Sequence, residues 1–256
     1  MLSRRTYLRL LMASFALAWV LLAISPNDRG AWMMENLPLI LCVAALAATY
    51  RTLPLSRASY TLIMLFLLLH AIGAHYTYTL VPWADWLRAV GIDLDTAHMG
   101  RNHFDRFVHF LYGLLLAYPI REILLRVAAP RGFWGYFFPV AITLSTSAVY
   151  ELAEWAVAIT FGGDLGIAYI GTQGDVWDAQ KDMALAGLGA LIAMGIAGAL
   201  NYALERDFAR EWNESLKVKI PTPLGEDELW RLWRRWRDRH KSVAPPPEKP
   251  AAGPTE

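Results

Sequence analysis

The sequence predicts an all-α polytopic membrane protein with six transmembrane helices. Hydrophobic residues make up 55% of the 256 residues, and they gather in long apolar runs. Such a run crosses the hydrocarbon core of a bilayer when it supplies about 20 residues of helix. A charged segment follows the last run, so a membrane part precedes a polar C-terminal part. This pattern excludes a soluble globular protein.

Six apolar runs qualify as spans. The first follows Arg4, Arg5 and Arg9 but lacks a clean small-residue cleavage site, which favours an uncleaved first helix over a signal peptide. The second run is short, so its boundaries are the least well defined. The predicted spans are residues 7–24, 37–50, 60–81, 104–125, 137–161 and 176–203.

Lysine and arginine predict how these spans are oriented. Loops on the cytoplasmic side of membrane proteins carry an excess of both residues. With a cytoplasmic N-terminus, the outer side keeps only Arg29, Arg88, Arg101, Arg106 and Lys181. We therefore expect a multi-pass membrane protein with both termini in the cytoplasm.

The predicted domains are a transmembrane domain at residues 1–204, a cytoplasmic amphipathic helical segment at 205–242 and a disordered tail at 243–256. In the middle segment Leu229, Trp233 and Trp236 recur at helical spacing among arginines. A basic amphipathic helix beside a span is held by anionic lipid, which explains this composition more simply than nucleic-acid binding does. The expected partner is the lipid bilayer, and no nucleic acid is expected.

Three pairs of ionisable residues lie three or four positions apart in the predicted spans, so each pair shares one helix face. Because neighbouring spans run in opposite directions, all three pairs fall in the outer half of the membrane. Ionisable groups at that depth are costly and are functional candidates by default. The candidate catalytic residues are Asp105, His109, Glu151, Glu154, Asp178 and Asp182.

The residue types in this set predict a metal or proton site. Histidine with carboxylates suits zinc or manganese, and carboxylates alone suit magnesium or calcium. The same groups could act as general acid and base, or relay protons. The predicted ligands of a divalent metal ion are His109, Glu154, Asp178 and Asp182, and the further pocket residues are His70, His75, Arg106, Asp175 and Lys181.

Structural roles remain open for several of these residues. His70 can join two helices through a hydrogen bond, and His75 can lie among the lipid head groups. Asp105 can pair with the neighbouring Arg106, and Asp175 can cap the last helix. These interpretations need no ligand.

Three stretches carry a resemblance to a known family. They are Asn-His-Phe-Asp-Arg-Phe-Val-His-Phe-Leu-Tyr-Gly at 102–113, Tyr-Glu-Leu-Ala-Glu-Trp at 150–155 and Gly-Thr-Gln-Gly-Asp-Val-Trp-Asp-Ala-Gln-Lys-Asp-Met at 171–183. Through these stretches the chain resembles the YjdF family of bacterial inner-membrane proteins over about residues 34–203. The resemblance implies a helical membrane fold and an inner-membrane location, but it supplies no reaction.

A fainter resemblance is to the VanZ-like membrane proteins, which are associated with glycopeptide-antibiotic resistance. Asp105, Arg106 and His109 match an Asp-Lys-x-x-His helix of that family, with arginine in place of lysine. Asp182 matches the aspartate of its final helix, whereas Ala186 stands where that family has asparagine. This resemblance implies a shared helical scaffold rather than a shared activity.

Three functions remain open from the sequence. The first is a metal-assisted enzyme that acts on an envelope lipid or another phosphate-bearing small molecule. The second is an ion- or proton-coupled transporter or permeability factor, in which the carboxylates titrate. The third is a non-catalytic membrane scaffold or sensor, in which the polar cluster only fixes how the helices pack.

Overall fold

The computed structural model describes residues 2–93, 101–161, 173–204, 208–220 and 225–241. All regular secondary structure in these ranges is helical, which confirms the predicted all-α class. The predicted disordered tail at 243–256 lies outside them. The chain forms two compact units, Met1–Leu216 and Lys217–Glu256, which are described separately below.

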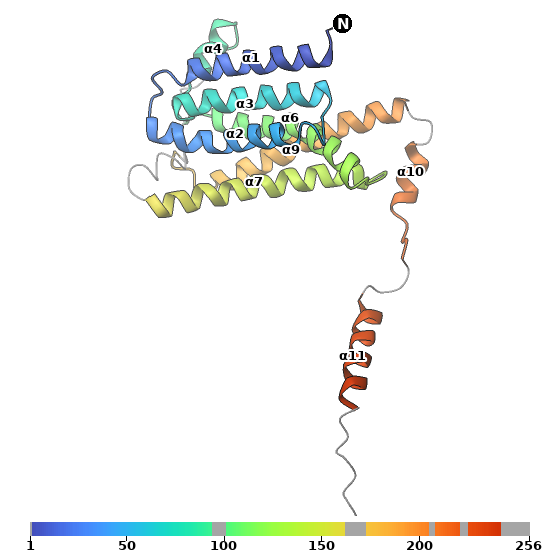
Figure 1. The fold of residues 1–256 in the computed structure, drawn as a ribbon. Coiled ribbons are helices and arrows are strands. Elements are labelled where there is room, and N and C mark those ends of the chain that lie inside the picture. The colour runs from blue at the N-terminus through green and yellow to red at the C-terminus, as the bar shows by residue number, and fades with distance from the viewer. Residues whose placement is uncertain (1, 94–100, 162–172, 205–207, 221–224, 242–256) are drawn as a thin grey trace, which may run out of the picture. The chain divides into compact units, whose positions relative to one another are not determined.

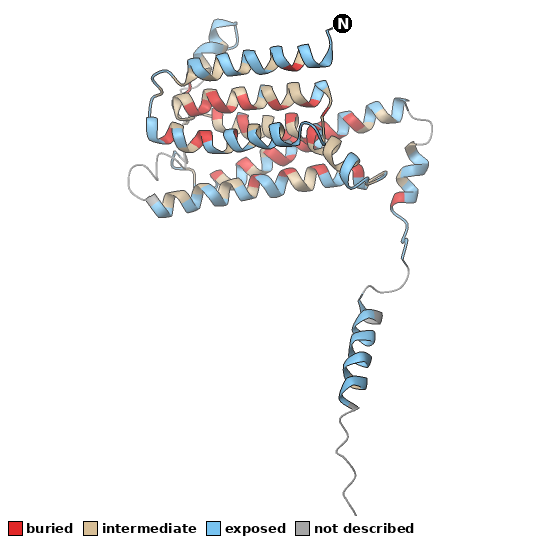
Figure 2. Cartoon of the chain, viewed as in Figure 1, coloured by how far each residue is buried: buried red, intermediate tan, exposed pale blue. Residues whose placement is uncertain are grey.

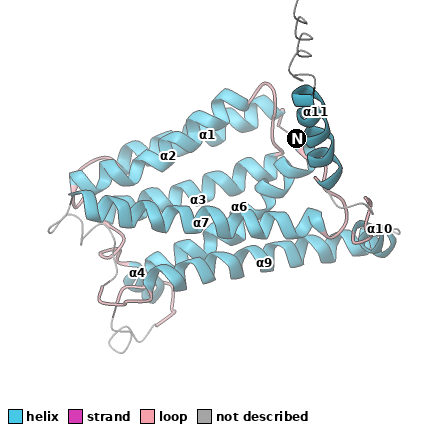
Figure 3. Cartoon of the chain, turned by 90° about the horizontal axis from the view of Figure 1, so that it is seen from below, coloured by secondary structure: helices cyan, strands magenta, loops and turns pink. Residues whose placement is uncertain are grey.

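Long helices run side by side in the described part of the first unit (Figures 1 and 3). They are α1 (Arg4–Leu22), α2 (Arg29–Thr49), α3 (Arg57–Tyr76), α6 (Phe104–Val127), α7 (Trp134–Phe161) and α9 (Asp178–Leu204). Two shorter helices are α4 (Trp83–Ala89) and α10 (Phe208–Ser215).

Five of the long helices are long and apolar enough to cross a membrane, judged on the described residues. The helix outside this set is α7, which has 28 residues but carries Glu151 and Glu154 within its apolar sequence. The count of six spans and the cytoplasmic placement of both termini therefore stay predictions.

Side-chain caps fix where the first three helices begin. Ser3 accepts a hydrogen bond from the backbone N–H of Thr6 at the start of α1, and Ser56 accepts one from that of Ser59 at the start of α3. Asp28 accepts one from the N–H of Ala31 at 2.8 Å, so α2 begins at Arg29. The second predicted span, which was expected to begin at residue 37, therefore begins too late.

The third predicted span extends too far. Thr77 and Tyr78 have φ angles of 57° and 49°, in the left-handed region, and they end α3 at Tyr76 rather than at residue 81. The turn folds Tyr78 back over Gly73, where a Cβ atom would overlap the tyrosine ring. Glycine at this position thus permits the turn that brings Tyr78 toward the bundle interior.

The closest helix pair is α6 and α9. A Cβ atom on Gly113 of α6 would overlap the carbonyl oxygen of Ala186, and one on Gly189 of α9 would overlap that of Phe110. Small residues let helix backbones approach in this way inside a membrane. Buried residues gather on α3, α6 and α9, whereas much of α1 and α7 is exposed (Figure 2).

The last helix of the first unit is packed against the bundle, and the helix of the second unit is exposed. In the first unit α10 packs on the start of α7, where Trp134 donates from Nε1 to the Ser215 carbonyl at 2.9 Å and Ser215 accepts from the Phe133 N–H. The compact first unit therefore includes α10, while the transmembrane domain was predicted to end at residue 204. In the second unit α11 (Glu226–Lys241) lies within the segment where the amphipathic helix was expected, and it exposes Leu229, Trp230, Leu232, Trp233 and Trp236.

Candidate metal centre

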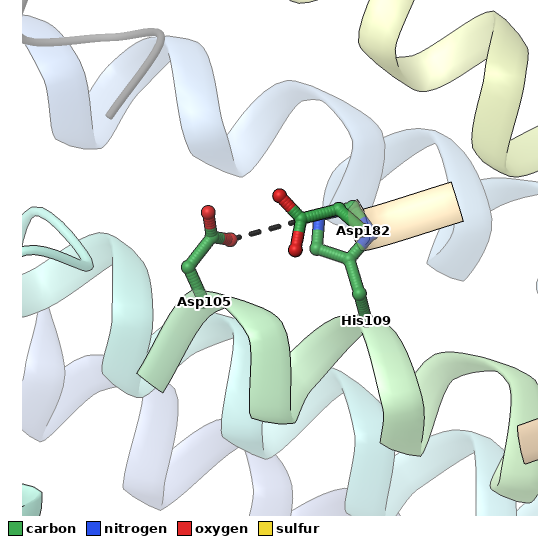
Figure 4. Close-up of side chains that lie close together, drawn as sticks. All are labelled: Asp105, His109 and Asp182. Atoms are coloured by element: carbon green, nitrogen blue, oxygen red, sulfur yellow. Dashed lines mark ion pairs between the residues drawn. The ribbon is translucent and has the colours of Figure 1, made fainter. Parts of the chain in front are cut away.

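The candidate centre lies where α6 and α9 begin. Asp105 and His109 occupy the first two turns of α6, and Asp182 lies one turn into α9. The close crossing of these two helices brings Asp182 over the α6 pair (Figure 4). One potential ligand atom from each of the three residues lies within 4.8 Å of the others.

The three side chains point at one another, but one carboxylate oxygen among them accepts no hydrogen bond from the described residues. Asp182 is only 2% exposed, yet its Oδ1 has no hydrogen-bond partner among the described residues. The Nε2 atom of His109 lies 3.6 Å from Oδ1 of Asp105 and 3.5 Å from Oε1 of Glu151 in α7. Oε1 of Glu151 is also buried and has no hydrogen-bond partner among the described residues.

These separations suit ligands of one metal ion better than hydrogen bonds. A hydrogen bond between nitrogen and oxygen spans about 2.7–3.2 Å. Two ligands bound tetrahedrally to one zinc ion at about 2.1 Å lie about 3.4 Å apart. Asp105, His109 and Asp182 therefore offer a mixed nitrogen and oxygen ligand set, which is the chemistry that zinc and manganese accept, and Glu151 lies beside it.

Asp178, a predicted metal ligand, lies in an ion-pair network with two arginines. Arg101 donates to both of its carboxylate oxygens, and Arg106 lies 3.2 Å from its Oδ1. A guanidinium group matches a carboxylate in this two-bond geometry and neutralises its charge. Both oxygens of Asp178 thus face arginine, which favours a place in the ion-pair network over its predicted role as a metal ligand.

Asp175 extends the same network at the mouth of the bundle. Its Oδ2 accepts hydrogen bonds from Lys181, at 2.6 Å, and from Arg106, while Oδ1 accepts from the Trp177 N–H. The Lys181 ammonium, the Trp177 N–H and the Arg106 guanidinium together hold the pKa of the Asp175 carboxyl well below its usual range. The network therefore ties the segment before α9 to the start of α6.

A cavity of about 320 Å³ opens beside the centre, between α2, α3, α6 and α7. Asp105 and His109 line its polar end, together with Glu154 of α7 and Glu35 of α2. Leu39, together with other apolar side chains of α2, α3 and α6, lines the remainder. Glu154, a predicted metal ligand, thus lies in the cavity wall beside the compact ligand cluster.

The predicted pocket histidines have structural partners. His70 lies at 2.7 Å, through Nε2, from the Glu35 carbonyl, which can only accept, so Nε2 carries the hydrogen. Its Nδ1 lies 2.5 Å from the Tyr78 hydroxyl and, in that tautomer, accepts from it. His75 points elsewhere and bonds through Nδ1 to the Leu22 carbonyl at the end of α1. His70 lines the cavity, whereas His75 lies outside it.

Comparison with known proteins identifies the family. The sequence model of DUF2238, a family of predicted membrane proteins, matches residues 7–202. The chain belongs to the DUF2238 family. Inner membrane protein YjdF of Escherichia coli (strain K12) is 39% identical over 193 residues, which cover 73% of this chain and 88% of that protein. No solved structure matches.

These matches bear directly on the predictions. They confirm the resemblance to the YjdF family and the location in the inner membrane. The region shared with DUF2238 contains every candidate site residue and ends before α10 and α11.

One residue of the cavity and one of the ion-pair network in this DUF2238 protein were absent from the predicted site. Glu35 is 5% exposed and accepts a hydrogen bond from the Tyr150 hydroxyl at 3.1 Å. The signal for it was Asp28, a helix-capping residue that starts α2 early enough to include Glu35. Arg101 was placed on the outer side, but no sequence signal linked it to Asp178, which lies 77 positions later.

Proposed function

We propose that this DUF2238 protein is a metal-dependent membrane enzyme that hydrolyses or transfers a phosphate-bearing group of an envelope lipid. The observation that carries the proposal is the cluster of Asp105, His109 and Asp182, whose ligand atoms lie within 4.8 Å of one another. Oδ1 of Asp182 is buried and has no hydrogen-bond partner among the described residues, which supports cation binding because a carboxylate buried without a partner is strongly unfavourable.

The residues of the cluster fit distinct roles. Asp105, His109 and Asp182 would hold a divalent ion, which polarises a phosphoryl or ester oxygen as a Lewis acid. Oε1 of Glu151 lies 3.5 Å from Nε2 of His109 and has no hydrogen-bond partner among the described residues, so it can hold or deliver a proton beside the reacting group. Substitution of Glu151 should therefore lower the reaction rate without releasing the metal ion.

The shape of the neighbouring cavity supports a lipid substrate. The polar end contains Asp105 and His109, and the walls continue past Leu39 and Leu67 into the apolar interior. A molecule that fills this space carries its polar group at the metal centre and its hydrocarbon chain between the helices. An enzyme in a membrane meets such molecules by lateral diffusion.

Proton-coupled transport is the second candidate. It is favoured by the hydrogen bond from Tyr150 to Glu35 and by Glu154 in the same cavity, since linked polar groups can relay protons. Further along the bundle α6 meets α9 through an apolar cluster whose buried members include Ala117, Ala190 and Met194, and these side chains cannot relay a proton. A proton flux in proteoliposomes that Glu35→Gln abolishes would support transport.

The enzyme proposal is tested by lipid turnover. Purified full-length protein in mixed micelles receives an extract of bacterial phospholipids with zinc, manganese or magnesium, and the products are followed by mass spectrometry. We expect head-group cleavage or transfer that requires one of these metals and that Glu151→Gln lowers at least about 100-fold while metal stays bound. The matched control is Glu122→Gln, a carboxylate at the other end of α6 that bonds Ser56 and Ser59. Metal-loaded, folded protein that turns over no lipid would overturn the proposal.

A further inference from the structure

The cavity beside the metal centre has a second acidic group of its own. Glu35 from α2 and Glu154 from α7 both line it, and Tyr150 donates a hydrogen bond to Oε2 of Glu35. Neither glutamate belongs to the compact cluster of Asp105, His109 and Asp182. Metal binding at the cluster therefore does not account for the two glutamates.

Charge in this cavity is unbalanced. None of the described residues that line it is a lysine or an arginine. Arg101 and Arg106 face Asp178 instead, within the ion-pair network at the mouth. A divalent ion at the centre would be offset by the carboxylates that hold it, which leaves Glu35 and Glu154 without a cation. A buried carboxylate with no cationic neighbour takes up a proton, and a ligand that brings an ammonium group allows it to ionise and pair, so these two glutamates favour a positively charged ligand group.

An unsatisfied hydroxyl in the same wall provides an independent indication of a ligand. Ser147 of α7 lines the cavity and is only 2% exposed, yet its Oγ has no hydrogen-bond partner among the described residues. Buried hydroxyls are normally hydrogen-bonded to protein or to a bound molecule. Its lone pairs can accept one N–H of an ammonium group, which has three to donate.

The rest of the cavity is suited to a hydrocarbon chain. Leu39, Ile63 and Leu67 belong to one buried apolar cluster and also line the cavity. A ligand with a charged head at Glu35 would therefore place an apolar chain along these three side chains. A free amine without a chain would leave this section unfilled and would gain little from burial.

We infer that the cavity binds a lipid whose head group carries a primary amine, with the ammonium held by Glu35, Glu154 and Ser147. This inference rests on the proposed function and names the substrate class of the same site. The phosphate of such a head group would face the metal centre at Asp105 and His109, while the chain lies against Leu39 and its neighbours. Anionic lipids with no amine are poor ligands, because the acidic wall repels them.

The test compares two probes that differ only at the amine. Lysophosphatidylethanolamine and lysophosphatidylcholine of equal chain length are titrated into detergent-solubilised full-length protein, and binding is followed by native mass spectrometry. EDTA is present throughout, so the measurement does not depend on a bound metal. Ethanolamine alone serves as the probe that has the amine but no chain.

We expect the primary-amine lipid to bind at least about 10-fold more tightly than its trimethylated counterpart, and ethanolamine to bind far more weakly than either. Glu35→Gln and Ser147→Ala should each reduce this preference, whereas Glu122→Gln should preserve it. Equal affinity of wild-type protein for the two lipids would overturn the inference, whether or not the variants fold. Amine selectivity in EDTA, combined with absence of metal after loading, would reject the enzyme and retain the amine site.

Discussion

Gly189 of α9 lies against the carbonyl oxygen of Phe110 in α6 so closely that no Cβ atom fits between them. Phe110 directly follows His109, and Gly189 lies two turns beyond Asp182. The glycine contact thus sets the separation of the two helices that carry Asp105, His109 and Asp182. Packing and site geometry are linked through this one approach of two backbones.

Replacing Gly189 by alanine should force α6 and α9 apart. We expect Gly189→Ala to destabilise the protein by about 1–3 kcal/mol, as overpacking of a tight interface does. The matched control is Gly195→Ala on the same helix, where a Cβ atom meets nothing within 4 Å. Thermal unfolding in detergent should show a lower Tm for the first variant and an unchanged or higher Tm for the second, since alanine favours helix. Equal Tm values would contradict a tight α6 and α9 contact.

Asp178 and Asp182 should respond in opposite ways to neutral substitution. Asp178→Asn leaves Arg101 and Arg106 without their buried partner, so we expect a loss of about 3–5 kcal/mol. Asp182→Asn removes one of several crowded carboxylates, so in EDTA its Tm should equal or exceed that of wild type. Unfolding of both variants in EDTA checks this. A large loss of stability for Asp182→Asn would assign Asp182 to the structural network instead.

The Asp175 network should give the protein a defined acid sensitivity. Because Lys181 and its other partners lower the Asp175 pKa, the ionised form stabilises the folded state above the ordinary aspartate pKa. That contribution is lost as pH falls below about 4 and the carboxylate takes up a proton. The Tm difference between wild type and Asp175→Asn should be constant near neutrality and shrink below about pH 4. A Tm difference between the two proteins that grows on acidification would contradict a stabilising role of the ionised Asp175 carboxylate.

The contact between Tyr78 and His70 should be structural. Tyr78→Phe removes the hydroxyl that bonds Nδ1 of His70, and we expect a loss of about 1–3 kcal/mol because this buried nitrogen loses its partner. Tyr50→Phe, at a more exposed position at the end of α2, is the control and should be nearly neutral. Metal content should be the same in both variants. Loss of metal in Tyr78→Phe alone would instead give His70 a part in the centre.

Helix geometry explains how much of the site followed from sequence. Asp105 and His109 share a face because they are four residues apart, and reversal of successive spans places them at the same end of the bundle as Glu151 and Asp182. Both arguments need only the period of a helix and the location of the spans. They do not need the contacts between particular side chains.

The remaining features depend on tertiary contacts or on exact helix ends. Glu35 was missed because the second span was expected from residue 37, while the Asp28 cap starts α2 eight residues earlier. The pairing of Asp178 with Arg101 was missed because Arg101 comes from a segment far away in the chain. Spacing along one helix carries no information about which distant arginine meets which carboxylate.

The metal content of the purified protein tests the central claim most directly. Wild type, Asp182→Asn, His109→Ala and the surface control Asp85→Asn are loaded, desalted and measured by plasma mass spectrometry, with circular dichroism to verify folding. We predict about one divalent ion per chain in wild type and in the control, and its loss in both centre variants. A folded wild-type protein that retains no metal after loading, or centre variants that retain it in full, would contradict the metal centre.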